Sequence, residues 1–195
     1  MSIRTKLNRL VVSTVAASTV FAAVQTHAAF GADDANVTVT GGLLSITNPA
    51  VGDFAGVTLD GTAKTTTATF GAFSATDARG TGAGWNVTVQ ATQFAEHNGA
   101  TYVASGATLP TSSLSMPAPT VAKSDGTSSA VPTITAGPYA IDAASAVKIA
   151  SAAADGTGMG SYSFTQGGSL SLSVPASAYA KTYRSDVTVS VVTGP

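Results

Sequence analysis

The stretch Trp85-Asn86-Val87-Thr88-Val89-Gln90-Ala91-Thr92 alternates apolar and polar side chains without a break. A period of two is typical of a β-strand with one face in the core and the other in water. The stretches 169–174 and 186–191 repeat this alternation, with Leu or Val on one face and Ser, Thr or Asp on the other. Shorter apolar runs predict further strands at 37–39, 43–47, 56–59, 66–73, 112–116, 131–135, 147–150 and 162–165.

Turn-forming residues separate these predicted strands. The chain has 20 Gly and 8 Pro among its 195 residues, and only 10% of the residues are charged. Many short strands joined by tight turns indicate an all-β fold, a single β-sandwich of short, mostly antiparallel strands. The Ala-rich segment 140–154 is predicted as a strand with one helical turn near Asp142. The segment 110–132 holds four of the prolines and is predicted as a long surface excursion.

The first 28 residues have the three parts of a secretory signal peptide. Three basic residues open the chain, residues 10–24 are apolar or small, and Thr26-His27-Ala28 offers small residues at the cleavage positions. The apolar run is shorter than the ~20 residues that span a bilayer. We therefore expect an exported protein whose mature part is one domain, 29–195, without a membrane span.

The predicted mature domain is acidic. Three of the nine Lys and Arg lie in residues 1–28, so six remain against ten Asp and Glu, a net charge of −4. A chain without a basic run lacks the electrostatic footprint of a nucleic-acid-binding protein, and that class of partner is excluded.

Few side chains in the sequence suit catalysis. There is no Cys, and His97 and Glu96 are the only His and Glu after residue 28. A Ser-His-Asp triad would need His97, and a glycosidase would need two placed carboxylates. No nucleophile motif accompanies His97, so a surface-loop histidine is the better interpretation. We expect no enzyme activity, no cofactor and no metal site.

Two loops share a glycine pattern, Gly80-Thr81-Gly82-Ala83-Gly84 and Gly156-Thr157-Gly158-Met159-Gly160. A phosphate-binding loop is excluded because neither loop matches GxGxxG or a P-loop, and neither opens a predicted helix. The pattern instead predicts turns with positive φ, which glycine adopts without steric cost. The glycines expected to have this structural role are Gly80, Gly82, Gly84, Gly156, Gly158 and Gly160.

The segment from Asp77 to Val89, with Asp-x-Arg-Gly before Gly-Trp, resembles the WxL surface domain family. Phe70-Gly71 upstream and the terminal stretch 183–195 add to the resemblance, which extends from around Asn36 to the C-terminus. Members of that family are secreted proteins attached noncovalently to the cell wall and thought to bind peptidoglycan. The resemblance implies a non-catalytic protein of the cell surface, outside the cell, whose partner is peptidoglycan or another wall polymer.

Two positions depart from the WxL pattern. The first motif reads Trp85-Asn86-Val87, with Val in place of Leu. The second motif belongs in the last strand, which reads Val189-Ser190-Val191 and has no Trp, so that Trp85 is the only Trp in the chain.

Trp85, Arg79 and Asp77 are the candidate ligand-binding residues, and each has a structural alternative. Trp85 shares a face with Val87 and Val89, which favours a place in the core over a rim position for stacking on sugar. Arg79 would either bind a carboxylate or phosphate of the wall through two parallel hydrogen bonds in a fork geometry, or donate hydrogen bonds to backbone carbonyls of its own loop. Asp77 lies two residues before Arg79, on the same face of an extended chain.

A rival interpretation is a structural subunit of a surface fibre or layer. Valine-rich terminal strands such as 37–40 and 187–192 would add to an exposed sheet edge of another chain. The partners that this interpretation implies are other surface proteins or a second copy of the same chain. No sorting signal follows the last predicted strand, and covalent anchoring is not expected.

Overall fold

The computed structural model describes residues 34–194, and the predicted signal peptide lies outside this range. Within this range, the structure contains no helical segment with the length and hydrophobicity of a membrane span. The described chain forms fourteen strands: β1 (Leu44–Ile46), β2 (Lys64–Ala68), β3 (Phe73–Asp77), β4 (Trp85–Ala91), β5 (Ala95–Glu96), β6 (Leu114–Met116), β7 (Pro119–Lys123), β8 (Thr133–Ile134), β9 (Tyr139–Ala140), β10 (Val147–Ala152), β11 (Gly160–Gln166), β12 (Leu170–Val174), β13 (Tyr183–Arg184) and β14 (Val187–Thr193).

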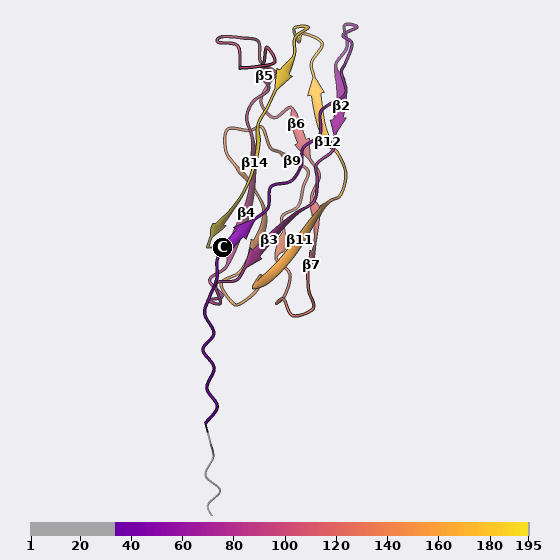
Figure 1. The fold of residues 1–195 in the computed structure, drawn as a ribbon. Helices are drawn as coiled ribbons and strands as arrows, with labels where there is room; N and C mark the ends of the chain where they lie inside the picture. The colour runs from indigo at the N-terminus through magenta and orange to yellow at the C-terminus, as the bar shows by residue number, and fades with distance from the viewer. Residues whose placement is uncertain (1–33, 195) are drawn as a thin grey trace, which may run out of the picture. The chain divides into compact units, whose positions relative to one another are not determined.

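The strands pair antiparallel in four sheets, and Figure 1 shows where the labelled strands of these sheets lie. One sheet has the order β1-β3-β11-β7, and a second has the order β14-β4-β10-β8. The third, β2-β12-β6-β9, reaches the upper part of the view, and β13 pairs with β5. The predicted all-β, antiparallel fold is confirmed.

One apolar core joins the first two sheets. Every second residue of β3 and of β4 is buried, as the alternation around Trp85 predicts. Trp85 of β4 packs against Tyr162 of β11, which belongs to the other sheet, with 6.1 Å between the ring centroids. Phe73 and Phe164, neighbours on β3 and β11, stack at 4.8 Å within the same core. The dry faces of the two sheets therefore meet as in a β-sandwich.

Two predicted strands are absent from the described structure. Residues 34–43 form no strand, and Val37 and Val39 are 87% and 88% exposed. Residues 56–59 also run as a loop, and they border a groove. Alternation identifies residues that suit a strand, but a strand also needs a neighbour that satisfies its backbone groups, and these two stretches have none.

The predicted strand 66–73 is two strands in different sheets. β2 ends at Ala68 and pairs with β12, whereas β3 begins at Phe73 and pairs with β1 and β11. The N–H of Gly71, between them, donates to the carbonyl of Ala50 at 2.7 Å. The apolar pattern continues through this change of sheet because both strands face the core.

The segment 110–132 is not a surface excursion, because it contains β6 and β7. Pro119 is tolerated as the first residue of β7, an edge strand that pairs with β11. In the segment 140–154, a turn without helix follows β9. Asp142 in this turn is buried, and its Oδ2 accepts hydrogen bonds from the N–H and Oγ of Ser113, each at 3.0 Å.

Candidate functional site

The two glycine-rich loops meet beside Trp85. The six glycines at alternate positions of these loops all have positive φ, between 63° and 109°, as the turn interpretation requires. The indole Nε1 of Trp85 donates to the carbonyl oxygen of Gly158 at 2.9 Å. A Cβ at Gly158 would lie 2.4 Å from the Cβ of Ala152 and 2.9 Å from the Trp85 indole nitrogen, so this position has no room for a side chain.

Arg79 closes the first loop onto the end of β3. Its Nε and Nη2 donate to the two carboxylate oxygens of Asp77, each at 2.8 Å. Nη2 also donates to the carbonyl of Gly84 at 2.8 Å, and Nη1 to Oγ1 of Thr193 at 3.3 Å. The fork geometry is therefore used inside the protein, and Arg79 bonds to its own loop.

The Asp77 carboxylate is the buried partner of this pair. Its side chain is 1% exposed, against 16% for Arg79. The hydrogen bond from the Arg79 side chain is the main cause that holds the pKa of Asp77 below its ordinary value of 3.8. The carboxylate stays ionised in a nearly dry position because the guanidinium neutralises it.

Trp85 lies in the core. Its exposed fraction is zero, which confirms the expectation that it shares the buried face of Val87 and Val89. β14, the strand that carries the second motif position, is the direct neighbour of β4, with Val191 opposite Val87 and Thr193 opposite Trp85. The structure thus places the two motif strands side by side, with the single indole facing inward.

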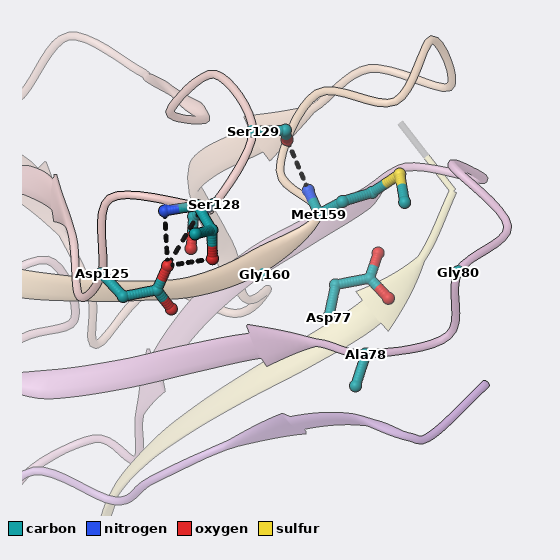
Figure 2. Close-up of a pocket in the computed structure, with 9 residues that line it drawn as sticks. Asp77, Ala78, Gly80, Asp125, Ser128, Ser129, Met159 and Gly160 are labelled. Carbon is teal, nitrogen blue, oxygen red and sulfur yellow. Dashed lines mark hydrogen bonds between the residues drawn. The ribbon is translucent and has the colours of Figure 1, made fainter. Parts of the chain in front are cut away.

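A small hollow of about 340 Å³ lies next to Asp77. Figure 2 shows the side chains of Asp77 and Met159 facing it, with Asp125 and Ser128 on the opposite side. Oδ1 of Asp125 accepts from the N–H of Ser128 at 3.0 Å, and Oγ of Ser129 accepts from the N–H of Met159 at 2.8 Å. The polar groups of this hollow are thus largely engaged with the protein's own turns.

A larger groove of about 1270 Å³ lies between the loop 51–59 and the segment 178–187. Its floor consists of side chains that are at most 8% exposed, namely Thr66, Phe94, Leu109, Leu114, Leu172 and Val174. The loop 51–59 is tied to this floor, because Oγ1 of Thr66 donates to the carbonyl of Ala55 at 2.7 Å and Phe54 packs edge-on against Phe94 at 5.7 Å.

The other wall of the groove carries tyrosines and paired charges. Tyr179 is 70% exposed, and the Tyr183 hydroxyl donates to the Tyr179 carbonyl at 2.9 Å. Lys181 forms an ion pair with Glu96 at 3.0 Å, and Arg184 forms one with Asp186 at 3.4 Å. This wall therefore presents the exposed ring of Tyr179, whose backbone carbonyl is hydrogen-bonded, and its two cations are neutralised by ion pairs.

The predicted surface-loop position of His97 is wrong, because this residue is only 9% exposed. It forms an isolated β-bridge with Tyr102, whose ring packs edge-on against the imidazole at 5.2 Å. Its Nδ1 accepts from the N–H of Gly99 at 3.1 Å. Among residues 34–194, no group of three or more His, Asp or Glu gathers in a metal-binding arrangement.

Comparison with protein families gives a match to the model described as "WxL domain surface cell wall-binding", over residues 32–195. The chain belongs to the WxL family. It is accordingly a non-catalytic surface domain that binds the cell wall without a covalent link, as the resemblance in sequence implies. Neither a curated protein nor a solved structure gives a significant match.

Within this WxL domain, the three candidate residues gather at one corner. Asp77 and Arg79 bond directly, and Arg79 reaches the carbonyl of Gly84, the residue before Trp85. The groove does not follow from the sequence, because the residues of its loop 56–59 suit a strand. The only signal for its other wall is Tyr179 and Tyr183, two aromatic residues in a stretch without strand alternation.

Proposed function

We propose that the wall polymer bound by this WxL domain is peptidoglycan. The observation that supports this choice is the pairing of its cations. Of the six Lys and Arg after residue 28, four are in ion pairs, and these are Lys64 with Asp60, Arg79 with Asp77, Lys181 with Glu96, and Arg184 with Asp186. A phosphate-rich wall polymer would need several free cations in one patch.

The two remaining cations do not form such a patch. Lys123 ends β7 and Lys148 lies in β10, on two different sheets. With a net charge of −4 after residue 28, the domain would repel an anionic polymer. The sugar chain of peptidoglycan avoids this cost, because it is built from acetylated amino sugars whose lactyl groups are amide-linked to peptides.

In this proposal, the polymer does not contact Trp85, Arg79 or Asp77, and these residues support binding only through the fold. A ligand could reach Trp85 only by opening the core, and it would have to displace both Asp77 and Gly84 to engage the Arg79 fork. The three residues hold the loops and the start of β4 in place. We also propose that the functional unit is residues 29–195, after removal of the signal peptide 1–28.

Sedimentation with purified wall sacculi tests the proposal. Residues 29–195 should co-sediment with sacculi before and after hydrogen fluoride treatment, which removes phosphodiester-linked anionic polymers and leaves peptidoglycan. Binding should persist in high salt, because few charges contribute. The double variant Lys123→Ala/Lys148→Ala is the matched control and should bind like the wild type. Loss of binding after hydrogen fluoride treatment would assign the partner to the anionic polymers.

A further inference from the structure

We propose that the groove between the loop 51–59 and the segment 178–187 holds the glycan strand of the wall polymer, by stacking of sugar rings on Tyr179. This inference rests on the proposed function, since it names the site and the part of peptidoglycan that is recognised. The groove is larger than the hollow beside Asp77, at about 1270 Å³ against about 340 Å³. Sites for small ligands typically measure ~300–1,000 Å³. The groove exceeds this range, so it has room for a piece of a polymer.

The groove has the mixed character that a sugar ring requires. A sugar presents C–H groups on its faces and hydroxyl or acetamido groups around its edge. The groove offers a dry floor, which includes Leu172 and Val174, for the apolar faces. Tyr179 offers an exposed ring with a polar hydroxyl at its tip, which suits one face and one edge of a sugar at once.

The backbone of Tyr179 is also fixed in position before any ligand binds. The hydrogen bond from the Tyr183 hydroxyl fixes the carbonyl of Tyr179, and β13, which begins at Tyr183, pairs with β5. Burial is the main cause that raises the pKa of Tyr183, so its hydroxyl remains protonated and available to donate at neutral pH. Because the backbone is fixed, only the side-chain rotation of the exposed Tyr179 ring has to be ordered on binding.

The charges around the groove favour the glycan over the stem peptides of the same polymer. Stem peptides carry free carboxylates and amines, which would call for unpaired charges opposite them. The cations of this wall, Lys181 and Arg184, are instead ion-paired with Glu96 and Asp186, so that among residues 34–194 Asp53 of the loop 51–59 is the one charged residue lining the groove outside the ion pairs. A neutral sugar chain leaves those pairs intact and pays no cost for breaking them.

Two glycines allow the groove to be blocked with a matched control. Gly56 lines the groove, its φ is not positive, and a Cβ built there meets no atom within 4 Å. Gly126 has the same properties but lies in the turn between Asp125 and Thr127, away from the groove. Leu is large enough to fill space and cannot stack as an aromatic ring does. The comparison of Gly56→Leu with Gly126→Leu therefore isolates the groove from the general effect of replacing an exposed glycine.

The probes are the two products of amidase digestion of peptidoglycan, namely peptide-free glycan strands and free stem peptides. Each is titrated by calorimetry in high salt, which screens the lactyl carboxylates that the digestion leaves on the strands. The wild type should bind the glycan strands, and Tyr179→Ala and Gly56→Leu should each weaken this binding at least ~10-fold, while Gly126→Leu leaves it unchanged. Circular dichroism should show all three variants folded, because residues 56, 126 and 179 are exposed.

Each other outcome overturns the inference. If sacculi bind the wild type and both groove variants equally, or if only the stem peptides bind, the proposed function stands and the glycan groove is wrong. If the groove variants change the oligomeric state and not glycan binding, the groove holds a second copy of the chain. If the wild type binds neither sacculi nor glycan strands, the proposed function fails with it.

Discussion

The indole of Trp85 and the carbonyl of Gly158 form a hydrogen bond of 2.9 Å between residues 73 positions apart in the chain. The bond joins the start of β4 to the glycine-rich turn before β11, which belongs to the opposite sheet. It also gives the buried N–H of the indole the partner that it needs in a dry core. The single tryptophan of this WxL domain therefore fastens the two sheets together.

The main effect of replacing Trp85 should therefore be a loss of folding stability. Trp85→Ala removes the largest fully buried side chain and should lower the free energy of unfolding by ~3–5 kcal/mol. Denaturant titration followed by circular dichroism measures this loss. In the wild type, tryptophan fluorescence should be blue-shifted in the native state and should move to longer wavelength on unfolding. Native emission already at the wavelength of water-exposed indole would contradict the buried position.

Gly158 should tolerate no side chain. Gly158→Ala places a Cβ against Ala152 and the Trp85 indole and also strains a φ of +77°, so it should cost more than ~2 kcal/mol. Gly61→Ala is the matched control, because Gly61 has a φ of +86° but open space around it, and it should cost only ~1–2 kcal/mol. Equal losses in the two variants would show that the close packing around Gly158 contributes nothing.

The Asp77–Arg79 pair should give the protein a specific pH dependence. Because the folded pKa of Asp77 lies below its ordinary value of 3.8, the carboxylate stabilises the fold above that pH, and the contribution is lost as pH falls through the lowered value. Asp77→Asn should lower the free energy of unfolding by ~1.5–3 kcal/mol at neutral pH.

The difference between Asp77→Asn and the wild type should shrink at acidic pH, below the ordinary pKa of the carboxyl. Urea titrations of both proteins at a series of pH values measure it. Other carboxylates with lowered pKa values, such as Asp60 and Asp125, are present in both proteins and cancel in the comparison. A difference that stays constant down to the lowest pH would exclude the ionised form of Asp77 as the stabilising species.

Part of this corner follows from the sequence alone. The alternation of Trp85, Val87 and Val89 predicts their common burial, and the spacing of Asp77 and Arg79 places both side chains on one face. The partners of these residues do not follow, because Gly158 lies in a distant turn and Thr193 in a distant strand, which only the tertiary fold brings near. Local patterns carry no information on such long-range contacts.

The groove and the residues before β1 show the same limit. The loop 56–59 and the stretch 37–39 have residues that suit strands, yet neither pairs, since pairing depends on whether a neighbouring strand is within reach. The sequence also offered no sign that Tyr179 and the loop 51–59 would border one groove, because more than 110 residues separate them.

The exposed valines before β1 provide a test of the fibre interpretation. If the domain acts as a wall-binding module, residues 29–195 should elute from size exclusion as a monomer at all concentrations, and Val37→Ser/Val39→Ser should change neither elution nor wall binding. Exposed side chains contribute little to stability, so this variant should also unfold like the wild type. Assembly that grows with concentration and disappears in the double variant would favour edge-strand addition.

We propose that the polymer is bound in the groove, whereas Trp85, Arg79 and Asp77 only support the fold. Nuclear magnetic resonance of ¹⁵N-labelled 29–195, titrated with peptide-free glycan strands, tests it most directly, because the one indole N–H gives a single signal. We expect the backbone amides of 51–59 and 178–187 to shift, while the Trp85 indole signal and the amides of 77–84 stay unchanged. If the indole signal and the amides of 77–84 shift, while the amides of 51–59 and 178–187 do not, binding in the groove is contradicted.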